Sequence, residues 1–293
     1  MTAEAAIRRA LQLRDGVVPN RNLTPAEAKE KYENCPVVLS DSTITRVRIH
    51  KYRIDRADPD FADPNKRILD QDADAELRHA RGHLRRWCQQ DGEVSQELRN
   101  RIRQIVREGR LTNTFSGKGS PKDMSLFLTT LSISGRIRDA LPASAAKPER
   151  LRIEDYADRF VGVDCSGFVN NFFIASAHYS DNLRNRNMPI RRYGQQINRF
   201  HFLPDRPQSF MLVWESMRHI AAIQDWGPGS WISGSTLRVI ESAASFGGLR
   251  NSLYDIVRPP ELTEANPVWQ VRRREQPGGG THRVFMVAPL PPV

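Results

Sequence analysis

The chain has 293 residues, of which 39% are hydrophobic and 8% aromatic, so it is long and apolar enough for one large domain or two smaller ones. Its formal net charge of +10 favours a polyanionic environment such as nucleic acid, anionic lipid or cell-wall polymer, although it also serves ordinary solubility. Three cysteines without a CxxC pair exclude a disulfide framework, and the absence of any run of about 18 apolar residues excludes a membrane-spanning helix.

Residues 1–120 are predicted to form a mainly helical module. Residues 2–15 have a charged, amphipathic helical pattern without the apolar core of a signal peptide, so we expect a soluble chain that is made in the cytoplasm. Thr24, Pro25 and Glu27 predict a helix start, because they suit the N-cap, the first helical position and the third position of a capping box. Further helices are expected over residues 74–90 and 95–107, one or two strands over 37–54, and loops over 55–72 and 112–123.

Residues 121–293 are predicted to form a second, α+β domain, with the loop over 112–123 as the boundary. A helix over 124–141 and a linker over 142–148 come first. Apolar residues at helical spacing then predict a buried helix that begins at Cys165. After an irregular loop over 180–208, strands are expected over 210–214, 219–226, 237–242, 268–274 and 283–288, the last two forming a hairpin around Pro277–Gly280. One helix followed by antiparallel strands is an α+β arrangement.

Cys165 stands at the first turn of its predicted helix, directly after Val161-Gly162-Val163-Asp164. At this position the backbone N–H groups lack helical acceptors, and the helix dipole has its positive end there. Both features favour a thiolate over a thiol, and the same N–H groups can hold an oxyanion. The position therefore indicates a reactive cysteine.

Two segments of the chain resemble the NlpC/P60 family of papain-like cysteine peptidases, to which the CHAP amidases are related. They are Asp164-Cys165-Ser166-Gly167-Phe168-Val169 and the strand that opens with His219-Ile220-Ala221-Ala222-Ile223. The resemblance covers about residues 155–290 and leaves the N-terminal part unexplained. It implies a papain-like core, in which the helix that carries the nucleophile packs on an antiparallel sheet.

The resemblance also implies a role for three side chains. Cys165 is expected to be the nucleophile, His219 the base that pairs with it, and Glu241 the group that orients the imidazole. The family often has His at the third position and CHAP-type amidases have Glu, which leaves the identity of this residue in question. Asp225 is the rival, but it lies six residues beyond His219, about 20 Å away along an extended strand.

Three further residues are expected to support this site. The backbone N–H of Ser166 would join that of Cys165 in an oxyanion hole, and Asp164 belongs to the same sequence block. Family members carry Tyr-x-x-Gly-Gly upstream, whereas here Tyr156 stands without the Gly-Gly. Tyr156 is therefore the candidate for the role of the family tyrosine in polarising the site.

Two other groups invite a functional interpretation that the sequence does not favour. His79 and His83 share a helix face near Cys88, but no acid lies between them and no fourth ligand is evident, so we expect a solvated face rather than a zinc site. The run Arg272-Arg273-Arg274 is expected to be the solvated end of a strand.

The resemblance implies a cysteine hydrolase, namely an amidase or endopeptidase that cuts peptidoglycan stem peptides without a cofactor or metal. A wall hydrolase without a signal peptide suggests an antibacterial effector that a dedicated secretion system delivers to the periplasm of a target cell. Its expected partners are the stem peptide and an immunity protein, and neither nucleic acid nor an integral membrane segment is expected. The alternatives are a papain-like deamidase, transglutaminase or acyltransferase that acts on a cytosolic protein or lipid, and a binding module with a vestigial site.

Overall fold

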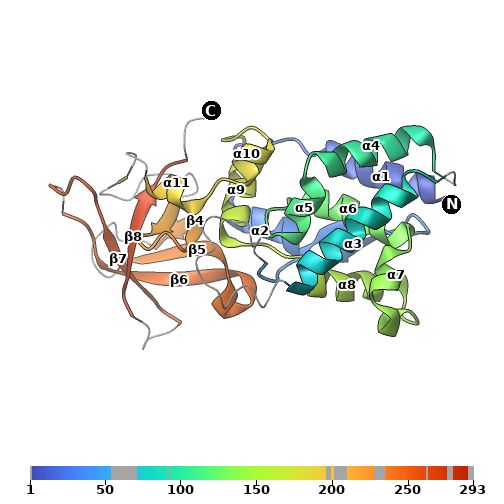
Figure 1. Ribbon diagram of the computed structural model, residues 1–293. Coiled ribbons are helices and arrows are strands. Elements are labelled where there is room, and N and C mark those ends of the chain that lie inside the picture. Colours follow the sequence, from blue (N-terminus) through green and yellow to red (C-terminus); the bar gives the residue numbers. More distant parts are fainter. Residues whose placement is uncertain are drawn as a thin grey trace. The chain divides into compact units, whose positions relative to one another are not determined.

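The computed structural model describes residues 2–53, 71–90, 92, 94–195, 199–200, 210–227, 235–261, 263–275 and 280–289, which form a mixed α+β structure (Figure 1). Most of the predicted loop over 55–72 and of the Pro277–Gly280 turn lies outside these residues. No helix of the described residues is long and apolar enough to cross a membrane.

Contacts divide the described residues into two units. The first holds those of Met1–Val18, Glu30–Arg56 and Asp63–Asp164, and the second those of Pro19–Lys29 and Cys165–Val293. The division therefore falls between Asp164 and Cys165 and not at the predicted boundary between residues 120 and 121. The physical reason is that the helices between 121 and 160 pack with the helices that precede them.

The first unit is built around one helix that is buried on nearly all sides. This helix, α6, spans Pro121–Ile133, and its residues from Asp123 to Leu131 are buried. It packs against α1, α5, α7, α8 and β1. The helices are α1 (Ala3–Asp15), α3 (Gln71–Trp87), α4 (Gln96–Arg107), α5 (Arg110–Phe115), α6, α7 (Arg136–Ala140), η2 (Pro142–Ser144) and α8 (Glu149–Phe160), and the strands β1 (Cys35–Val38) and β2 (Ile44–Val47) form an antiparallel hairpin.

Local capping residues set several helix boundaries. Helix α2 (Pro25–Glu33) begins with the predicted capping box, in which the backbone N–H of Thr24 donates to Glu27 at 2.8 Å and that of Glu27 donates to the Thr24 hydroxyl at 3.2 Å. The predicted loop over 112–123 is wrong in part, because α5 occupies its start and Ser120 caps α6 near its end. The single helix expected over 124–141 is two helices, separated at Gly135, whose φ is +85°. Helix α8 was not predicted.

The segment that precedes Cys165 is held by backbone contacts within the first unit. The N–H of Val163 donates to the Lys51 carbonyl at 2.8 Å, and that of Asp164 donates to the Gly117 carbonyl at 3.0 Å. The Asp164 carboxylate pairs with Lys118 Nζ at 2.7 Å, and both side chains are buried. These contacts fix the chain up to the residue before the nucleophile candidate.

In its described residues, the second unit holds a six-stranded barrel, three α-helices and the N-terminal part of α2. The strands follow one another around the barrel in sequence order, each antiparallel to the next, and β8 closes it against β3. They are β3 (Met211–Trp214), β4 (Ile220–Trp226), β5 (Thr236–Ala243), β6 (Gly248–Arg258), β7 (Trp269–Arg273) and β8 (His282–Val287), with η4 (Ala244–Phe246) before β6, and the helices are α9 (Cys165–Ala175), α10 (Leu183–Arg186) and α11 (Ile190–Gly194). The five predicted strands and the α+β arrangement are confirmed, whereas the longest strand, β6, was not predicted.

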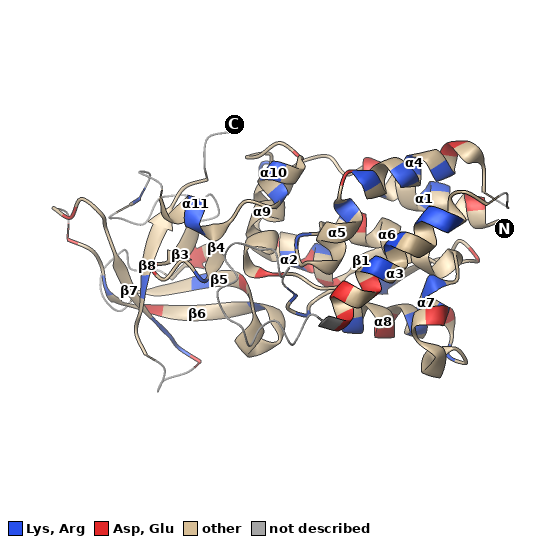
Figure 2. Cartoon of the chain, in the orientation of Figure 1, with Lys and Arg blue, Asp and Glu red and all other residues tan. Residues whose placement is uncertain are grey.

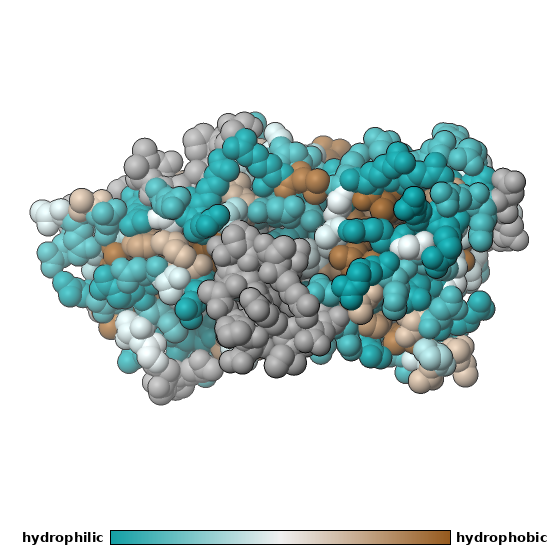
Figure 3. All heavy atoms as spheres, viewed as in Figure 1, coloured by the Kyte–Doolittle hydropathy of each residue, from teal (hydrophilic) through white to brown (hydrophobic). Residues whose placement is uncertain are grey.

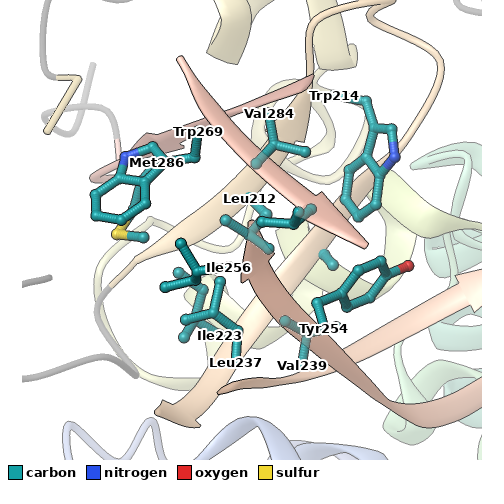
Figure 4. Packing of buried hydrophobic residues seen from close by; sticks show 12 residues of the cluster. Leu212, Trp214, Ile223, Leu237, Val239, Tyr254, Ile256, Trp269, Val284 and Met286 are labelled. Carbon is teal, nitrogen blue, oxygen red and sulfur yellow. The ribbon is translucent and has the colours of Figure 1, made fainter. Parts of the chain in front are cut away.

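Alternate residues of every strand fill the barrel (Figure 4). This period of two is the one expected when successive side chains of a strand point to opposite faces. Each strand contributes two residues that are two positions apart: Leu212 and Trp214, Ala221 and Ile223, Leu237 and Val239, Tyr254 and Ile256, Trp269 and Val271, and Val284 and Met286. Figure 4 shows Trp214 and Tyr254 on one side of this cluster and Trp269 and Met286 on the other.

Helix α9 covers the outer face of β4 and β5. It packs against both strands. The residues of these strands that alternate with the inward-facing ones, including Ile220, Ala222 and Ile240, are buried as well. Because both faces are buried over residues 220–223 of β4 and 239–240 of β5, these stretches are apolar without alternation. The helix that begins at Cys165 is thus packed on an antiparallel sheet.

Gly117 offers a test of the backbone packing before Cys165. A Cβ on Gly117, whose φ is +82°, would lie 2.2 Å from the Arg53 carbonyl oxygen, whereas one on Gly135 would meet only the tip of the Arg138 side chain at 3.7 Å. We expect Gly135→Ala to cost about 1 kcal/mol through its positive φ alone. Gly117→Ala should cost about 3 kcal/mol, because a backbone clash is added. Urea denaturation measures both, and equal losses would contradict the described packing.

Candidate active site

Polar side chains extend the inward-facing rows of the barrel at one of its ends. Strands β3, β5 and β7 end there and β4 and β8 begin there, since neighbouring strands are antiparallel. His219 and His282 lie two residues before the inward-facing Ala221 and Val284, and Glu241 and Arg273 lie two residues after Val239 and Val271. The alternation that packs the apolar core therefore turns four titratable side chains toward the mouth of the barrel.

Cys165, His219 and Glu241 form a hydrogen-bonded series within the second unit. Nε2 of His219 lies 2.6 Å from Oε2 of Glu241. The Cys165 side chain also interacts with the imidazole and raises the pKa of His219. The structure thus brings together the three residues to which the resemblance assigned catalytic roles.

Glu241 is fully buried, and two residues besides His219 hold its carboxylate. Nη2 of Arg273 donates to Oε1 at 2.6 Å. The Tyr254 hydroxyl donates to both carboxylate oxygens, at 3.2 and 3.3 Å, and also contacts Arg273. Burial of an ionised carboxylate is costly unless it is paired and hydrogen-bonded, and here both conditions are met.

These contacts determine where the shared proton resides. Burial alone would lower the pKa of His219, but its hydrogen bonds to Cys165 and Glu241 and the charges of these groups raise that pKa to about 9. Burial alone would raise the pKa of Glu241, but His219 and Arg273 lower it to about 2. The proton between the two groups therefore stays on the imidazole, and His219 is an imidazolium at neutral pH.

The same shifts link the stability of the protein to pH. A raised pKa of His219 stabilises the folded state below its ordinary value of about 6.5, and this contribution is lost as the pH rises through about 9. A lowered pKa of Glu241 stabilises the folded state above its ordinary value of about 4.3, and this contribution is lost as the pH falls toward about 2. Both contributions to stability are complete only in the mildly acidic range between the ordinary pKa values of Glu and His, about 4.3 and 6.5.

Aromatic rings pack around the charged groups. Trp214 meets the His219 ring at 4.5 Å between centroids and 70° between planes, which is an edge-on contact. The Arg273 guanidinium lies 4.0 Å from the centroid of Phe246, a cation–π distance. Only 17% of the His219 side chain is exposed. These contacts restrict the imidazole and the guanidinium to one orientation each.

Cys165 is the first residue of α9 and is 3% exposed. Its backbone N–H belongs to the first helical turn, where donors have no acceptor within the helix. Ser166 follows within the same turn and is also buried. An oxyanion hole made by the N–H groups of these two residues fits this position and stays a prediction.

The remaining predicted site residues make other contacts. Asp225 is partly exposed and pairs with Arg238 at 3.0 Å, so it does not compete with Glu241 for the imidazole. Asp164 pairs with Lys118 in the first unit. The expected role of Tyr156 needs correction, because Tyr156 is buried in the first unit and its hydroxyl donates to Glu76 at 2.6 Å. Tyr156 and Asp164 therefore make structural contacts there.

His79 and His83, for which a solvated helix face was expected, lie on α3. No group of three His, Cys, Asp or Glu residues with the geometry of a metal site occurs in the described part of the chain. Nε2 of His83 lies 2.9 Å from the Ser134 carbonyl oxygen, which accounts for this side chain without a metal.

Sequence reasoning missed two residues of the site. Arg273 was assigned to a solvated strand end, although its position two residues after Val271 and four after Trp269 places it on the inward face of β7. This alternation is visible in the sequence and could have indicated that Arg273 faces inward. Tyr254 lies in β6, whose polar residues obscure the alternation, and only Tyr254 and Ile256 mark the inward face.

Comparisons with family models, with curated proteins and with solved structures found no match to this chain.

The carboxylate of Glu241 is expected to control the pKa of His219. Glu241→Gln keeps the shape of the side chain and removes its charge, so the pKa of His219 should fall by about 1–3 pH units from its value near 9. Nitrogen NMR of the imidazole between pH 5 and 11 measures this. Asp225→Asn, at the exposed rival, is the control and should leave the pKa in place. An unchanged pKa in the Glu241→Gln variant would contradict the assignment.

Arg273 is expected to contribute to stability through Glu241. Arg273→Met leaves the carboxylate without its permanent cation, which should cost about 3–5 kcal/mol. The neighbouring Arg272 is exposed, so Arg272→Met removes the same charge at a cost of about 0.5 kcal/mol or less. Chemical denaturation at neutral pH compares the two variants, and similar losses would mean that the Arg273–Glu241 pair has no special role.

Proposed function

We propose that this protein is a cysteine hydrolase that cuts an amide bond of peptidoglycan stem peptides. The observation that carries the proposal is the series Cys165–His219–Glu241, with the cysteine at the start of a buried helix and the carboxylate fully buried. The choice of substrate rests on the resemblance to the NlpC/P60 family. A net charge of +10 is consistent with an anionic polymer as substrate.

The proposed reaction has two stages. The Cys165 thiolate attacks the carbonyl carbon of the amide, and the resulting oxyanion accepts hydrogen bonds from backbone N–H groups at the start of α9. As the carbon–nitrogen bond breaks, the His219 imidazolium gives its proton to the leaving amine, and a thioester on Cys165 remains. The neutral imidazole then takes a proton from water, whose oxygen attacks the thioester and releases the acid and the thiolate.

Glu241 acts through His219 and does not contact the substrate in this mechanism. Its carboxylate accepts the Nε2–H bond, which fixes the tautomer and turns Nδ1 toward Cys165. Arg273 keeps Glu241 ionised, so the imidazole can gain and lose its proton without passing it to the carboxylate.

Digestion of purified sacculi tests the reaction. The unmodified protein should release muropeptides whose masses identify the bond, and Cys165→Ala should reduce their release by at least about 10³-fold. Cys35→Ala is the matched control, because Cys35 is also buried but lies in the first unit, and it should retain activity. Release by the Cys165→Ala variant, or no release by the unmodified protein, would contradict the proposal.

The proposal extends to an antibacterial effector that acts in the periplasm of a target cell and is blocked in the producer by an immunity protein. Expression in a Gram-negative host should then be toxic only when the chain is directed to the periplasm. Toxicity confined to the cytosol would instead assign the site to a deamidase, transglutaminase or acyltransferase with a cytosolic target.

A further inference from the structure

Helices α3, α4 and α5 of the first unit surround a cavity of about 810 Å³. This volume lies within the range of about 300–1,000 Å³ that is usual for small-molecule sites. The cavity has no part in the proposed hydrolase reaction, whose groups belong to the other unit. The charge and polarity of its lining side chains indicate which class of ligand it would bind.

Four arginines on two helices line the cavity. Arg81 and Arg85 are four residues apart in α3, and Arg103 and Arg107 are four residues apart in α4, so each pair lies on one helix face. Figure 2 shows Lys and Arg segments recurring along both helices. Four guanidinium groups thus converge on one space.

The floor of the cavity is apolar. Leu84 of α3 and Cys88, which directly follows α3, are 1% and 2% exposed, and Val106 of α4 is partly exposed in the same lining. Figure 3 shows apolar surface enclosed by hydrophilic atoms on the face of the first unit that carries these helices. A ligand of this cavity therefore meets cationic groups and apolar surface together.

The arginine charges are not balanced by carboxylates. As far as the structure describes the chain, Arg85 and Arg107 make neither an ion pair nor a hydrogen bond, and no Asp or Glu lines the cavity. Arg81 donates to the Thr112 hydroxyl at 2.6 Å, and Arg103 donates to the Cys88 carbonyl at 2.8 Å. Elsewhere in this unit, arginines pair with acids, as Arg14 does with Asp123 and Arg136 with Glu76.

We propose that this cavity binds a phosphate ester with an apolar body. A doubly charged phosphate neutralises more of the four like charges than a single carboxylate does, and guanidinium groups bind phosphate through paired hydrogen bonds. The apolar part of the ligand would contact Val106, the partly exposed member of the three apolar residues in the lining. A soluble phosphate monoester and the phosphate monoester headgroup of phosphatidic acid share this chemistry.

Calorimetric titration of the full chain with 1-naphthyl phosphate tests the proposal, with inorganic phosphate and 1-naphthol as partial probes. Arg85→Gln combined with Arg107→Gln should weaken the binding of naphthyl phosphate at least about tenfold. The control combines Arg86→Gln with Arg101→Gln, which changes the same helices by the same charge outside the cavity and should alter affinity less than about twofold. Inorganic phosphate should bind at least about tenfold more weakly than the ester, and naphthol should not bind measurably.

Two results would overturn the proposal. Equal weakening in the two double variants would mean that only net charge matters, and equal affinity for inorganic phosphate and naphthyl phosphate would mean that the apolar floor plays no part. Sedimentation with vesicles of equal parts phosphatidic acid and phosphatidylcholine then identifies the source. This comparison applies once the ester is found to bind in the cavity. Vesicle binding that is lost only when Arg85 and Arg107 are replaced assigns the site to a lipid headgroup. Vesicle binding that is the same in the two double variants assigns it to a free ester.

Discussion

An ionised carboxylate buried at the mouth of a β-barrel must be neutralised where it stands, and Glu241 meets this requirement through three neighbours. His219 and Arg273 supply positive charge and Tyr254 supplies a further hydrogen bond. Because these contacts hold the pKa of Glu241 near 2, the carboxylate stays ionised and fixes a proton on His219. The state of the imidazole beside Cys165 therefore depends on an arginine that contacts the carboxylate and not the imidazole.

The barrel makes this arrangement possible by simple alternation. The same period of two that turns Leu212, Val239 and Val271 into the core turns the next inward-facing residues toward the mouth. Helix α9 lies on the outer face of β4 and β5, and its first residue joins the imidazole at the start of β4. The start of α9, the start of β4 and the end of β5 thus meet at one site, although they are far apart in the sequence.

Local sequence patterns predicted much of this structure, whereas contacts between residues far apart in the sequence became evident only in the structure. Thr24 and Glu27 form a cap from adjacent residues, and the apolar spacing after Cys165 defines α9, so both were predictable. The partnership of His219 with Glu241 was inferred only through a resemblance. Arg273 was missed because it lies in β7, which pairs with β6 and β8 but not with β5, so its contact with Glu241 exists only in the folded barrel. Tyr254 was missed because the polar residues of β6 hide its pattern. The unit boundary was missed because packing of α6 to α8 is tertiary.

Alkylation kinetics of the three cysteines test the central claim most directly. Cys35, Cys88 and Cys165 are all at most 3% exposed, so burial alone gives them similar protection. Burial raises the pKa of Cys35 to about 12 and also raises that of Cys88, whereas Cys165 shares a hydrogen bond with an imidazolium. Iodoacetamide with peptide mapping should modify Cys165 fastest, and His219→Ala should remove this preference. Equal rates at the three sites, or a preference that survives His219→Ala, would contradict the account.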